Sequence, residues 1–237
     1  MNLVLFEPHE VDHILRVKVT GRRARHIRDI LHAQSAQTLR AGLLNGLVGS
    51  ARIEQITSES VEFTFQPELK PPPPAPIKLV LALPRPKVLR RVLANVTSLG
   101  IKEIYLIHAY RVEKPYWNSE QVQPQQIREA CLRGLEQARD TLLPEVFLRQ
   151  RFKPFVQDEL PEIRKGTKGL VAHPGGGAVP KLVTGEPVTL VIGPEGGFIP
   201  FEVDLLQTAG FQPVQLGERI LNVETAVSYA VGGLREW

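Results

Sequence analysis

A glycine-rich loop near the C-terminal end is the segment of this chain best suited to binding a ligand. It follows Val188–Ile192, an apolar, β-branched run typical of a strand that is buried on both faces. Gly193, Gly196 and Gly197 would let a ligand approach the main chain closely. Pro200 then suits the first turn of a helix. The sequence therefore predicts a strand–loop–helix unit whose loop either binds a ligand or makes a tight connection without one.

The charges around this loop argue against a phosphate ligand. Glu195, Glu202 and Asp204 surround the expected helix start, and the loop contains no lysine. The segment also lacks the Gly-Lys-Ser/Thr ending of a P-loop and the G-x-G-x-x-G pattern of a dinucleotide site. An acidic mouth repels a polyphosphate and tolerates a cationic or zwitterionic ligand. S-adenosylmethionine is a ligand of that kind, because it carries a sulfonium and an ammonium group and no phosphate.

A second candidate segment, residues 216–226, reads as a polar turn followed by an amphipathic helix. The apolar residues recur at helical spacing, at Val223, Ala226, Val227, Ala230, Val231 and Leu234. Asn222 is expected at the N-cap and Glu224 in the first turn, where each would stabilise the helix end. Two interpretations stay open for both residues, helix capping and contact with a ligand. Arg219, in the turn, either offers a charged fork to RNA or is a solvated loop charge.

The two segments would form one pocket if both follow strands of the same α/β sheet, because such sheets bind ligands at the carboxyl ends of their strands. A third segment, His173-Pro174-Gly175-Gly176-Gly177, follows an expected strand at residues 169–172. It is either a third wall of that pocket or a flexible turn.

Together these motifs resemble the ribosomal RNA small-subunit methyltransferase E family. That family belongs to the SPOUT superfamily of knotted, S-adenosylmethionine-dependent RNA methyltransferases. The residues that carry the resemblance are those at 192–198, 216–217, 219–221 and 224–226. Weaker likeness extends to residues 26–31, 99–101 and 136–139.

The resemblance implies an α/β fold with two parts. These are a C-terminal SPOUT-type trefoil-knotted α/β domain with a mostly parallel sheet, and a small N-terminal PUA-like β-barrel. It also implies a homodimer that methylates N3 of a uridine in the 16S rRNA of the small ribosomal subunit, with S-adenosyl-L-methionine as cofactor. Arg219 would stabilise the negative charge on the uridine that has lost its N3 proton, and Glu224 would orient that arginine or act as the base. The cofactor-binding residues expected on this basis are His173, Ile192, Gly193, Glu195, Gly196, Gly197, Leu216, Gly217, Ile220, Leu221, Asn222, Thr225 and Ala226.

This chain departs from the family pattern at three positions. Asn222 stands where the family usually has arginine, and Asn95 and Ser98 stand where a lysine and a glutamate are usual. Two alternatives therefore stay open beside the uridine methyltransferase. One is a non-catalytic RNA- or ribosome-binding protein that retains the fold, and the other is a methyltransferase for a different RNA nucleotide.

Two basic clusters are candidates for contacts with RNA phosphates. The first lies between Asp12 and Asp29, with no acid among its members Arg16, Lys18, Arg22, Arg23, Arg25 and Arg28. The second comprises Arg85, Lys87, Arg90 and Arg91, of which Arg85 and Lys87 are the expected contacts. The alternative for each cluster is a solvated face of the protein.

The composition of the 237-residue chain limits the other possibilities. A formal net charge of +4 favours a polyanionic partner mildly. The single cysteine, Cys131, excludes an internal disulfide and falls on an apolar helix face, where a packed thiol is expected. The six histidines are scattered, which makes a metal site improbable. Without a signal-peptide pattern or a bilayer-length apolar run, the chain is expected to be cytoplasmic, with no membrane partner.

The order of elements predicts where the domains begin and end. Residues 1–66 are expected to form the RNA-binding β-barrel, with a helix near 24–31, a hairpin at Asn45-Gly46, and strands at 3–6, 17–19, 38–43, 48–56 and 61–65. Residues 67–76 read as a stiff proline-rich linker. In the methyltransferase domain, residues 77–237, strands and helices alternate, which indicates a parallel sheet with helices on both faces. The expected strands are 77–83, 103–107, 146–148, 169–172, 188–192 and 213–216, and the expected helices are 86–99, 123–139, 201–209 and 223–235.

Overall fold

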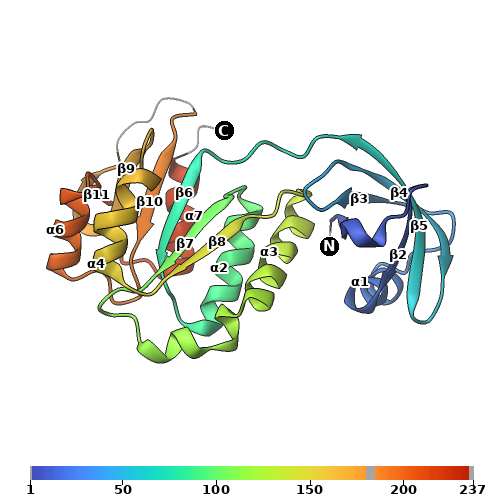
Figure 1. Ribbon diagram of the computed structural model, residues 1–237, viewed down its shortest axis with the longest axis horizontal. Coiled ribbons are helices and arrows are strands. Elements are labelled where there is room, and N and C mark those ends of the chain that lie inside the picture. The colour runs from blue at the N-terminus through green and yellow to red at the C-terminus, as the bar shows by residue number, and fades with distance from the viewer. Residues whose placement is uncertain (1, 180–184, 235–237) are drawn as a thin grey trace. The chain divides into compact units, whose positions relative to one another are not determined.

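The computed structural model describes residues 2–179 and 185–234 of the chain, which divide into two compact units (Figure 1). The first unit runs to Pro73 and includes Leu132–Leu143, and the second comprises Pro74–Cys131 and the chain from Pro144 onward. The two units are described separately below. No helix in the described part of the chain is both long and apolar enough to cross a bilayer.

The first unit contains a curled, five-stranded sheet with the order β1-β3-β4-β5-β2. All neighbouring strands are antiparallel except β1 and β3, which are parallel. Its strands are β1 (Val4–Phe6), β2 (Arg16–Thr20), β3 (Thr38–Leu43), β4 (Val48–Ile56) and β5 (Ser60–Leu69). In β2 the buried Val17 and Val19 alternate with exposed cations, as the period-two pattern predicts. The rings of Phe6, Phe63 and Phe65 pack in the core with centroids 5.5 and 5.4 Å apart.

Short helical segments complete the first unit. They are η1 (Pro8–Glu10), α1 (Gly21–Arg25) and η2 (His26–Ile30). The helix expected at 24–31 is confirmed but begins earlier, at Gly21, directly after β2. The Asn45-Gly46 hairpin is also confirmed, since it joins the antiparallel strands β3 and β4, with Asn45 at a φ of 58°.

The predicted linker overlaps the end of β5. Pro67 still pairs with Gly49 of β4, and the strand continues to Leu69. Proline is tolerated there because β2 pairs with β5 only as far as Thr64, which leaves the other side of β5 without a strand partner. The segment Leu132–Leu143, which sequence reasoning assigned to the C-terminal domain, folds with the first unit. One contact that joins it to this unit is the hydrogen bond from the amide of Asn45 to the carbonyl of Thr141, at 2.8 Å.

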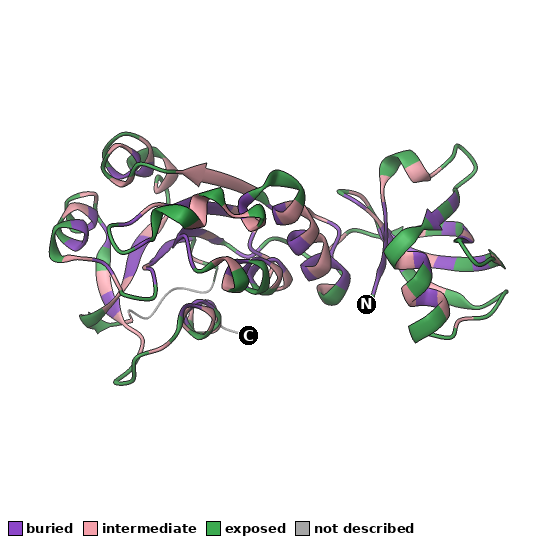
Figure 2. Cartoon of the chain, turned by 90° about the horizontal axis from the view of Figure 1, so that it is seen from below, coloured by how far each residue is buried: buried purple, intermediate pink, exposed green. Residues whose placement is uncertain are grey.

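The second unit is built on a six-stranded sheet with the order β11-β9-β10-β6-β7-β8. Every described pair of neighbouring strands is parallel, so the carboxyl ends of the strands meet at one edge. The strands are β6 (Ile77–Ala82), β7 (Glu103–Ile107), β8 (Glu145–Arg149), β9 (Lys168–Ala178), β10 (Val188–Ile192) and β11 (Gln212–Gln215). All five residues of β10 are buried, as its unbroken apolar run predicts. In Figure 2 the helices alternate between buried and exposed residues, whereas strands carry continuous buried stretches.

Helices cover both faces of this sheet (Figure 1). The four that the sequence predicted are α2 (Pro86–Ser98), α3 (Pro124–Ala138), α6 (Pro200–Thr208) and α7 (Val223–Gly233). Arg235, the predicted end of the last helix, lies outside the described residues. Cys131 of α3 is buried as predicted, and burial raises the pKa of its thiol.

Sequence reasoning missed several short helical segments. These are η3 (Lys114–Asn118), η4 (Glu120–Val122), α4 (Phe152–Pro154), η5 (Phe155–Glu159) and α5 (Leu160–Ile163). In the stretch after β8, Pro154 and Pro161 hide the helical signal in the sequence. The segment is nevertheless helical because Phe155, Val156 and Leu160 are buried against the rest of the unit.

Candidate functional site

A pocket of about 240 Å³ lies at the carboxyl edge of the parallel sheet. Its walls come from the ends of β10 and β11 and from the part of β9 beyond its pairing with β10. The lining consists of residues 172–174, 192–197, 215–221, Val223 and Ala226. The two loops expected to form one pocket therefore do so, because their strands are parallel and share one edge of the sheet.

Most of the predicted cofactor-binding residues line this pocket. They are His173, Ile192, Gly193, Glu195, Gly196, Gly197, Leu216, Gly217, Ile220, Leu221 and Ala226. Arg219, predicted to be catalytic, lines it too. The lining also includes Pro174, Pro194, Glu218 and Val223, which lie inside the three predicted segments. Sequence reasoning missed Ala172 and Gln215, and each of these directly precedes a predicted segment.

Two alternatives were left open for residues 173–177, a wall of the pocket and a flexible turn, and the structure excludes the flexible turn because the segment is part of a strand. β9 continues to Ala178, and Gly177 pairs with Val214 of β11. A side chain at Gly176 would lie 2.7 Å from the Val214 amide nitrogen, so glycine permits this close approach of two backbones. His173 and Pro174, before these glycines, line the pocket.

His173 carries a buried polar atom that the protein itself leaves unsatisfied. Its Nδ1 is inaccessible to solvent and has no hydrogen-bond partner among the described residues. Because a buried polar atom without a partner is costly, a ligand group that completes this hydrogen bond would be favoured in the pocket.

The glycine loop, which lines the pocket, forms a tight turn. The amide of Gly197 donates to the carbonyl of Pro194 at 2.8 Å, and Gly197 has a φ of 72°, in the region that favours glycine. A side chain on Gly193 would lie 3.2 Å from the buried ring of Phe198. Both glycines therefore have structural reasons for their identity, and both leave the main chain open to a ligand.

Residues that follow other strands hold this loop in place. The amide of Arg85, after β6, donates to Oε1 of Glu195 at 3.0 Å. The guanidinium of Arg111, after β7, donates to the carbonyl of Gly196. Its Cδ lies 3.0 Å from the position that a Cβ on Gly196 would occupy. Arg111 carried no recognisable signal in the sequence, because only the parallel pairing of β6, β7 and β10 brings it to the loop.

Glu202 does not contribute to an acidic mouth, contrary to the prediction. Its side chain is buried, with the residue 3% exposed, and it does not line the pocket. Its carboxylate accepts from the amide of Ile199 at 3.0 Å and from the amide of Tyr110 at 2.7 Å. Asp204 does not line the pocket either, so the carboxylates in its walls are those of Glu195 and Glu218.

Asn222 and Thr225 are predicted cofactor residues that lie outside the pocket lining. The side-chain oxygen of Asn222 accepts from the amide of Thr225 at 2.9 Å and caps α7. Of the two interpretations left open for Asn222, the structure therefore supports helix capping.

Glu224 also lies outside the lining and forms an ion pair with Arg91 of α2. The two Arg91–Glu224 hydrogen bonds measure 2.5 and 3.1 Å, and they raise the pKa of Arg91. Among the described residues no hydrogen bond or ion pair joins Glu224 to Arg219, and the partner of Glu224 is Arg91. Arg219 itself is exposed and has no carboxylate partner among the described residues.

Four of the six cations in the first basic cluster already have carboxylate partners. Arg22 pairs with Glu136 at 2.7 Å, Lys18 with Glu62 at 3.1 Å, and Arg28 with Asp29 at 2.6 Å, which lowers the pKa of Asp29. Arg16 and Arg25 are exposed and have no ion pair in the described residues.

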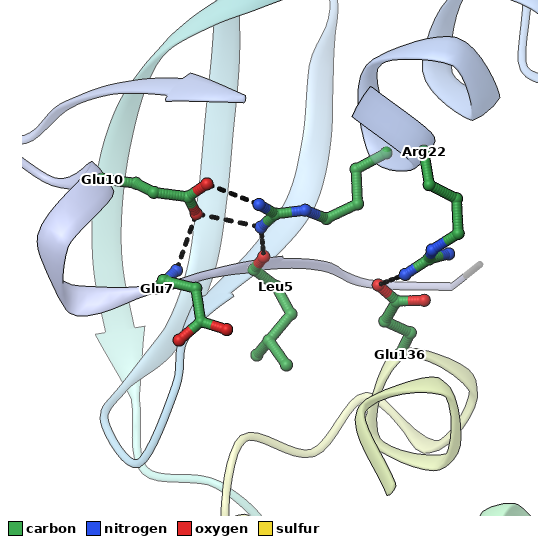
Figure 3. A network of polar contacts seen from close by, with 6 residues as sticks. Leu5, Glu7, Glu10, Arg22 and Glu136 are labelled. Carbon is green, nitrogen blue, oxygen red and sulfur yellow. Dashed lines mark hydrogen bonds and ion pairs between the residues drawn. The ribbon is translucent and has the colours of Figure 1, made fainter. Parts of the chain in front are cut away.

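Arg23 is the most confined of the six cations. Its guanidinium bonds both carboxylate oxygens of Glu10, at 2.5 and 3.0 Å, and the carbonyl of Leu5. The side chain is 19% exposed. Glu10 also accepts from the amide of Glu7 at 2.9 Å (Figure 3). Arg23 therefore joins α1 to β1 and η1 within the first unit.

Comparisons with known proteins give a consistent picture. The model of a family described as an RNA methyltransferase domain matches residues 71–235. Over 240 residues the chain is 32% identical to ribosomal RNA small subunit methyltransferase E of Treponema pallidum, an alignment that covers 97% of this chain and 89% of that protein. It is 24% identical to ribosomal RNA small subunit methyltransferase E 1 of Borreliella burgdorferi, over 95% and 94% of the two chains.

Solved structures share the fold. A methyltransferase of Legionella pneumophila, solved with bound SAM, has a TM-score of 0.77 at 22% identity. Ribosomal RNA small subunit methyltransferase E of Neisseria gonorrhoeae, also bound to S-adenosyl methionine, has a TM-score of 0.74 at 19% identity. Each comparison covers 98% of this chain and 96% of the other.

Proposed function

The chain belongs to the RNA methyltransferase family, and we propose that it transfers the methyl group of S-adenosylmethionine to N3 of a uridine in 16S rRNA of the small ribosomal subunit. The observation that carries the proposal is the pocket in which the two motifs meet at the carboxyl edge of a parallel sheet. The relatives named for methylation of small-subunit RNA, one of them 32% identical, supply the substrate class.

The pocket suits S-adenosylmethionine in its chemistry. The glycine loop exposes main-chain groups, Glu195 and Glu218 supply negative charge for a cationic ligand, and Nδ1 of His173 lacks a partner. Walls such as Ile192, Leu216 and Leu221 are apolar. When bound there, the cofactor supplies a methyl group activated by its sulfonium sulfur.

We assign the main catalytic role to Arg219. N3 must lose its proton, here to solvent water, before it attacks the methyl group, and the uracil ring carries negative charge until the new bond forms and the sulfonium sulfur becomes a neutral thioether. Arg219 lines the pocket, and its guanidinium has no carboxylate partner among the described residues, so it is free to stabilise that charge.

Glu224 receives a positioning role in this proposal. A base must reach the proton that it removes, and the Glu224 carboxylate lies outside the lining and is engaged by Arg91. The pair joins the first turn of α7 to α2, and so helps to fix the turn that carries Arg219.

We further propose that exposed cations bind the RNA backbone. Arg16 and Arg25 of the first unit are the best candidates in the first cluster, because its other members have carboxylate partners. Arg85 and Lys87 are exposed at the start of α2, and Arg85 adjoins the glycine loop. Action on the small subunit would take place in the cytoplasm.

The resemblance to the SPOUT superfamily supports three finer proposals, a PUA-like barrel, a homodimer and a trefoil knot. The curled sheet of the first unit is compatible with the barrel. For the knot, the support is topological, since β11 lies at one end of the sheet while the following α7 packs on α2. An experimental structure that follows the chain from end to end and shows no knot would exclude this proposal.

The decisive test is a reaction with unmodified small ribosomal subunits. The purified protein is incubated with subunits and S-adenosylmethionine, the RNA is digested, and its nucleosides are analysed by mass spectrometry. We expect new N3-methyluridine. A different methylated nucleoside would indicate another target in the same RNA. If the protein is folded and binds the cofactor but no methylated nucleoside forms, its substrate is a different RNA.

The non-catalytic alternative is separated from this proposal by calorimetry. A protein that only binds RNA need not bind S-adenosylmethionine, whereas an enzyme must. One reason for that alternative was that Asn222 stands where the family usually has arginine. Asn222 caps α7 and does not line the pocket, which weakens this reason.

A further inference from the structure

Tyr110 combines an exposed ring with a firmly held backbone. The residue is 76% exposed, the largest value for any aromatic residue in the described chain. Its amide nevertheless donates to Oε1 of Glu202 at 2.7 Å, and Glu202 is buried. An aromatic ring left in water gains nothing for folding, whereas a fixed backbone lowers the entropy lost when such a ring binds a partner.

The position of Tyr110 is tied to the loop of the cofactor pocket on both sides. The next residue, Arg111, donates to the carbonyl of Gly196, which lines the pocket. The carboxylate that holds the Tyr110 amide also accepts from the amide of Ile199, just beyond the same loop. The segment after β7 therefore borders the glycine loop, and Tyr110 is the residue that it exposes.

The charges beside Tyr110 suit a polyanion. Arg111 is exposed on one side, and Arg85 follows the neighbouring strand β6. Of the carboxylates near it, Glu195 lines the cofactor pocket, and Glu113 accepts from the hydroxyl of Tyr116 at 2.9 Å. Unpaired RNA bases are commonly bound in this way, by an aromatic ring next to arginines.

We propose that Tyr110 stacks on an unpaired base of the RNA substrate at the mouth of the cofactor pocket. This inference rests on the proposed function, because it assumes an RNA substrate. Stacking tolerates any base, so Tyr110 would hold and orient the RNA strand without reading its sequence. The ring, and not its hydroxyl, is the part that matters.

Three variants test the proposal: Tyr110→Ala, Tyr110→Phe, and Tyr229→Ala as a control that removes another exposed aromatic ring, on α7. We expect Tyr110→Ala to weaken binding of small subunits and raise KM for them by roughly ten-fold, the typical effect of losing one stacked base. Tyr110→Phe should match the unaltered protein, as should Tyr229→Ala. Calorimetric affinity for S-adenosylmethionine should be the same in all of them.

Two outcomes would overturn the proposal. In one, Tyr110→Ala binds and methylates small subunits as the unaltered protein does. In the other, it loses affinity for S-adenosylmethionine in step with its RNA affinity, which would make Tyr110 a support of the pocket rather than a contact to RNA.

A fluorescence measurement keeps this proposal separate from the proposed function. In Tyr110→Trp, stacking on a base should quench the new indole when a single-stranded uridine oligoribonucleotide is added, measured against the unaltered protein with its two native tryptophans. If the unaltered protein fails to methylate small subunits but the quench is present, the proposed function fails and the stacking surface stands. If methylation occurs and no quench is seen with the oligonucleotide or with small subunits, the stacking proposal fails alone.

Discussion

Two charged residues that lie close in sequence, Arg219 and Glu224, have different surroundings. Arg219 lines the pocket with no ion-pair partner among the described residues, whereas Glu224 is engaged by Arg91 outside the lining. A cation free to face a reacting group stabilises developing charge, and a carboxylate held by an arginine on another helix fixes geometry. The difference between them leads to two predictions at the residue scale.

Replacing Arg219 should separate catalysis from cofactor binding. We expect Arg219→Ala to lower kcat for methyl transfer by about 10²–10³-fold, the usual loss when one preorganised electrostatic group is removed. Its calorimetric affinity for S-adenosylmethionine should stay within a few-fold, because the rest of the pocket lining is unchanged. Arg219→Lys should recover part of the rate, and an Arg219→Ala variant with full activity would exclude the assigned role.

Glu224→Gln distinguishes a positioning residue from a base. The pair lies at the surface, so we expect its loss to lower the free energy of unfolding only slightly and to reduce methyl transfer by no more than a few-fold. The matched variant Arg91→Gln should behave in the same way, because it breaks the same pair. A loss of activity of a hundred-fold or more in Glu224→Gln, with Arg91→Gln still active, would assign Glu224 to the chemistry after all.

At the scale of elements, the site depends on how helix ends and loops are fixed to the sheet. Asn222 caps α7, Glu202 joins the start of α6 to the segment after β7, and Arg111 holds the glycine loop. None of these side chains needs to touch a ligand to affect its binding, because each fixes main chain that borders the pocket.

The cap on α7 gives the prediction at this scale. Asn222→Ala should lower the free energy of unfolding by about 1 kcal/mol, because the amide of Thr225 loses its acceptor. Asn222→Asp should retain the cap and the stability, as measured by denaturant unfolding. If Asn222→Ala were as stable as the unaltered protein but bound S-adenosylmethionine more weakly, Asn222 would contact the cofactor, as first expected from the sequence.

At the scale of the whole molecule, net charge gives a poor count of the cations available to RNA. The chain carries a formal charge of +4, and the first basic cluster looks continuous in sequence. In the fold, Lys18, Arg22, Arg23 and Arg28 are paired with carboxylates, which leaves Arg16 and Arg25 as the members of this cluster without an ion pair among the described residues. Replacing one cation of this short stretch should therefore change RNA binding, whereas replacing another should change the stability of the fold.

Salt dependence of RNA binding tests this division. Arg16→Ala and Arg25→Ala should each weaken small-subunit binding and reduce the slope of log K against log salt by about one, with no change in thermal stability. Arg23→Ala should instead lower the unfolding temperature of the protein, because it leaves the partly buried Glu10 without its charged partner. If Arg23→Ala changed the salt slope and left the unfolding temperature unaltered, Arg23 would belong to the RNA surface.

The sequence alone determined the main strands, the longer helices and the two motifs of this protein. Strands 38–43, 48–56, 103–107 and 188–192 have the predicted bounds, because apolar periodicity reports burial directly. The glycine loop and the polar turn were recognisable because their residue types are tied to local backbone geometry and to a family pattern. Pocket walls close to these motifs could therefore be named in advance.

Only the tertiary structure decided which side chains are available at the site. The carboxylate of Glu202 is buried and accepts hydrogen bonds from two amides. Glu224 is paired with Arg91, and Arg23 with Glu10, and the two members of each pair lie on different elements. Arg111 and Tyr110 border the glycine loop because β7 lies two strands from β10 in one parallel sheet. A charge in a sequence gives no sign of its partner, because ion pairs and hydrogen bonds form between residues that only the packing of elements brings together.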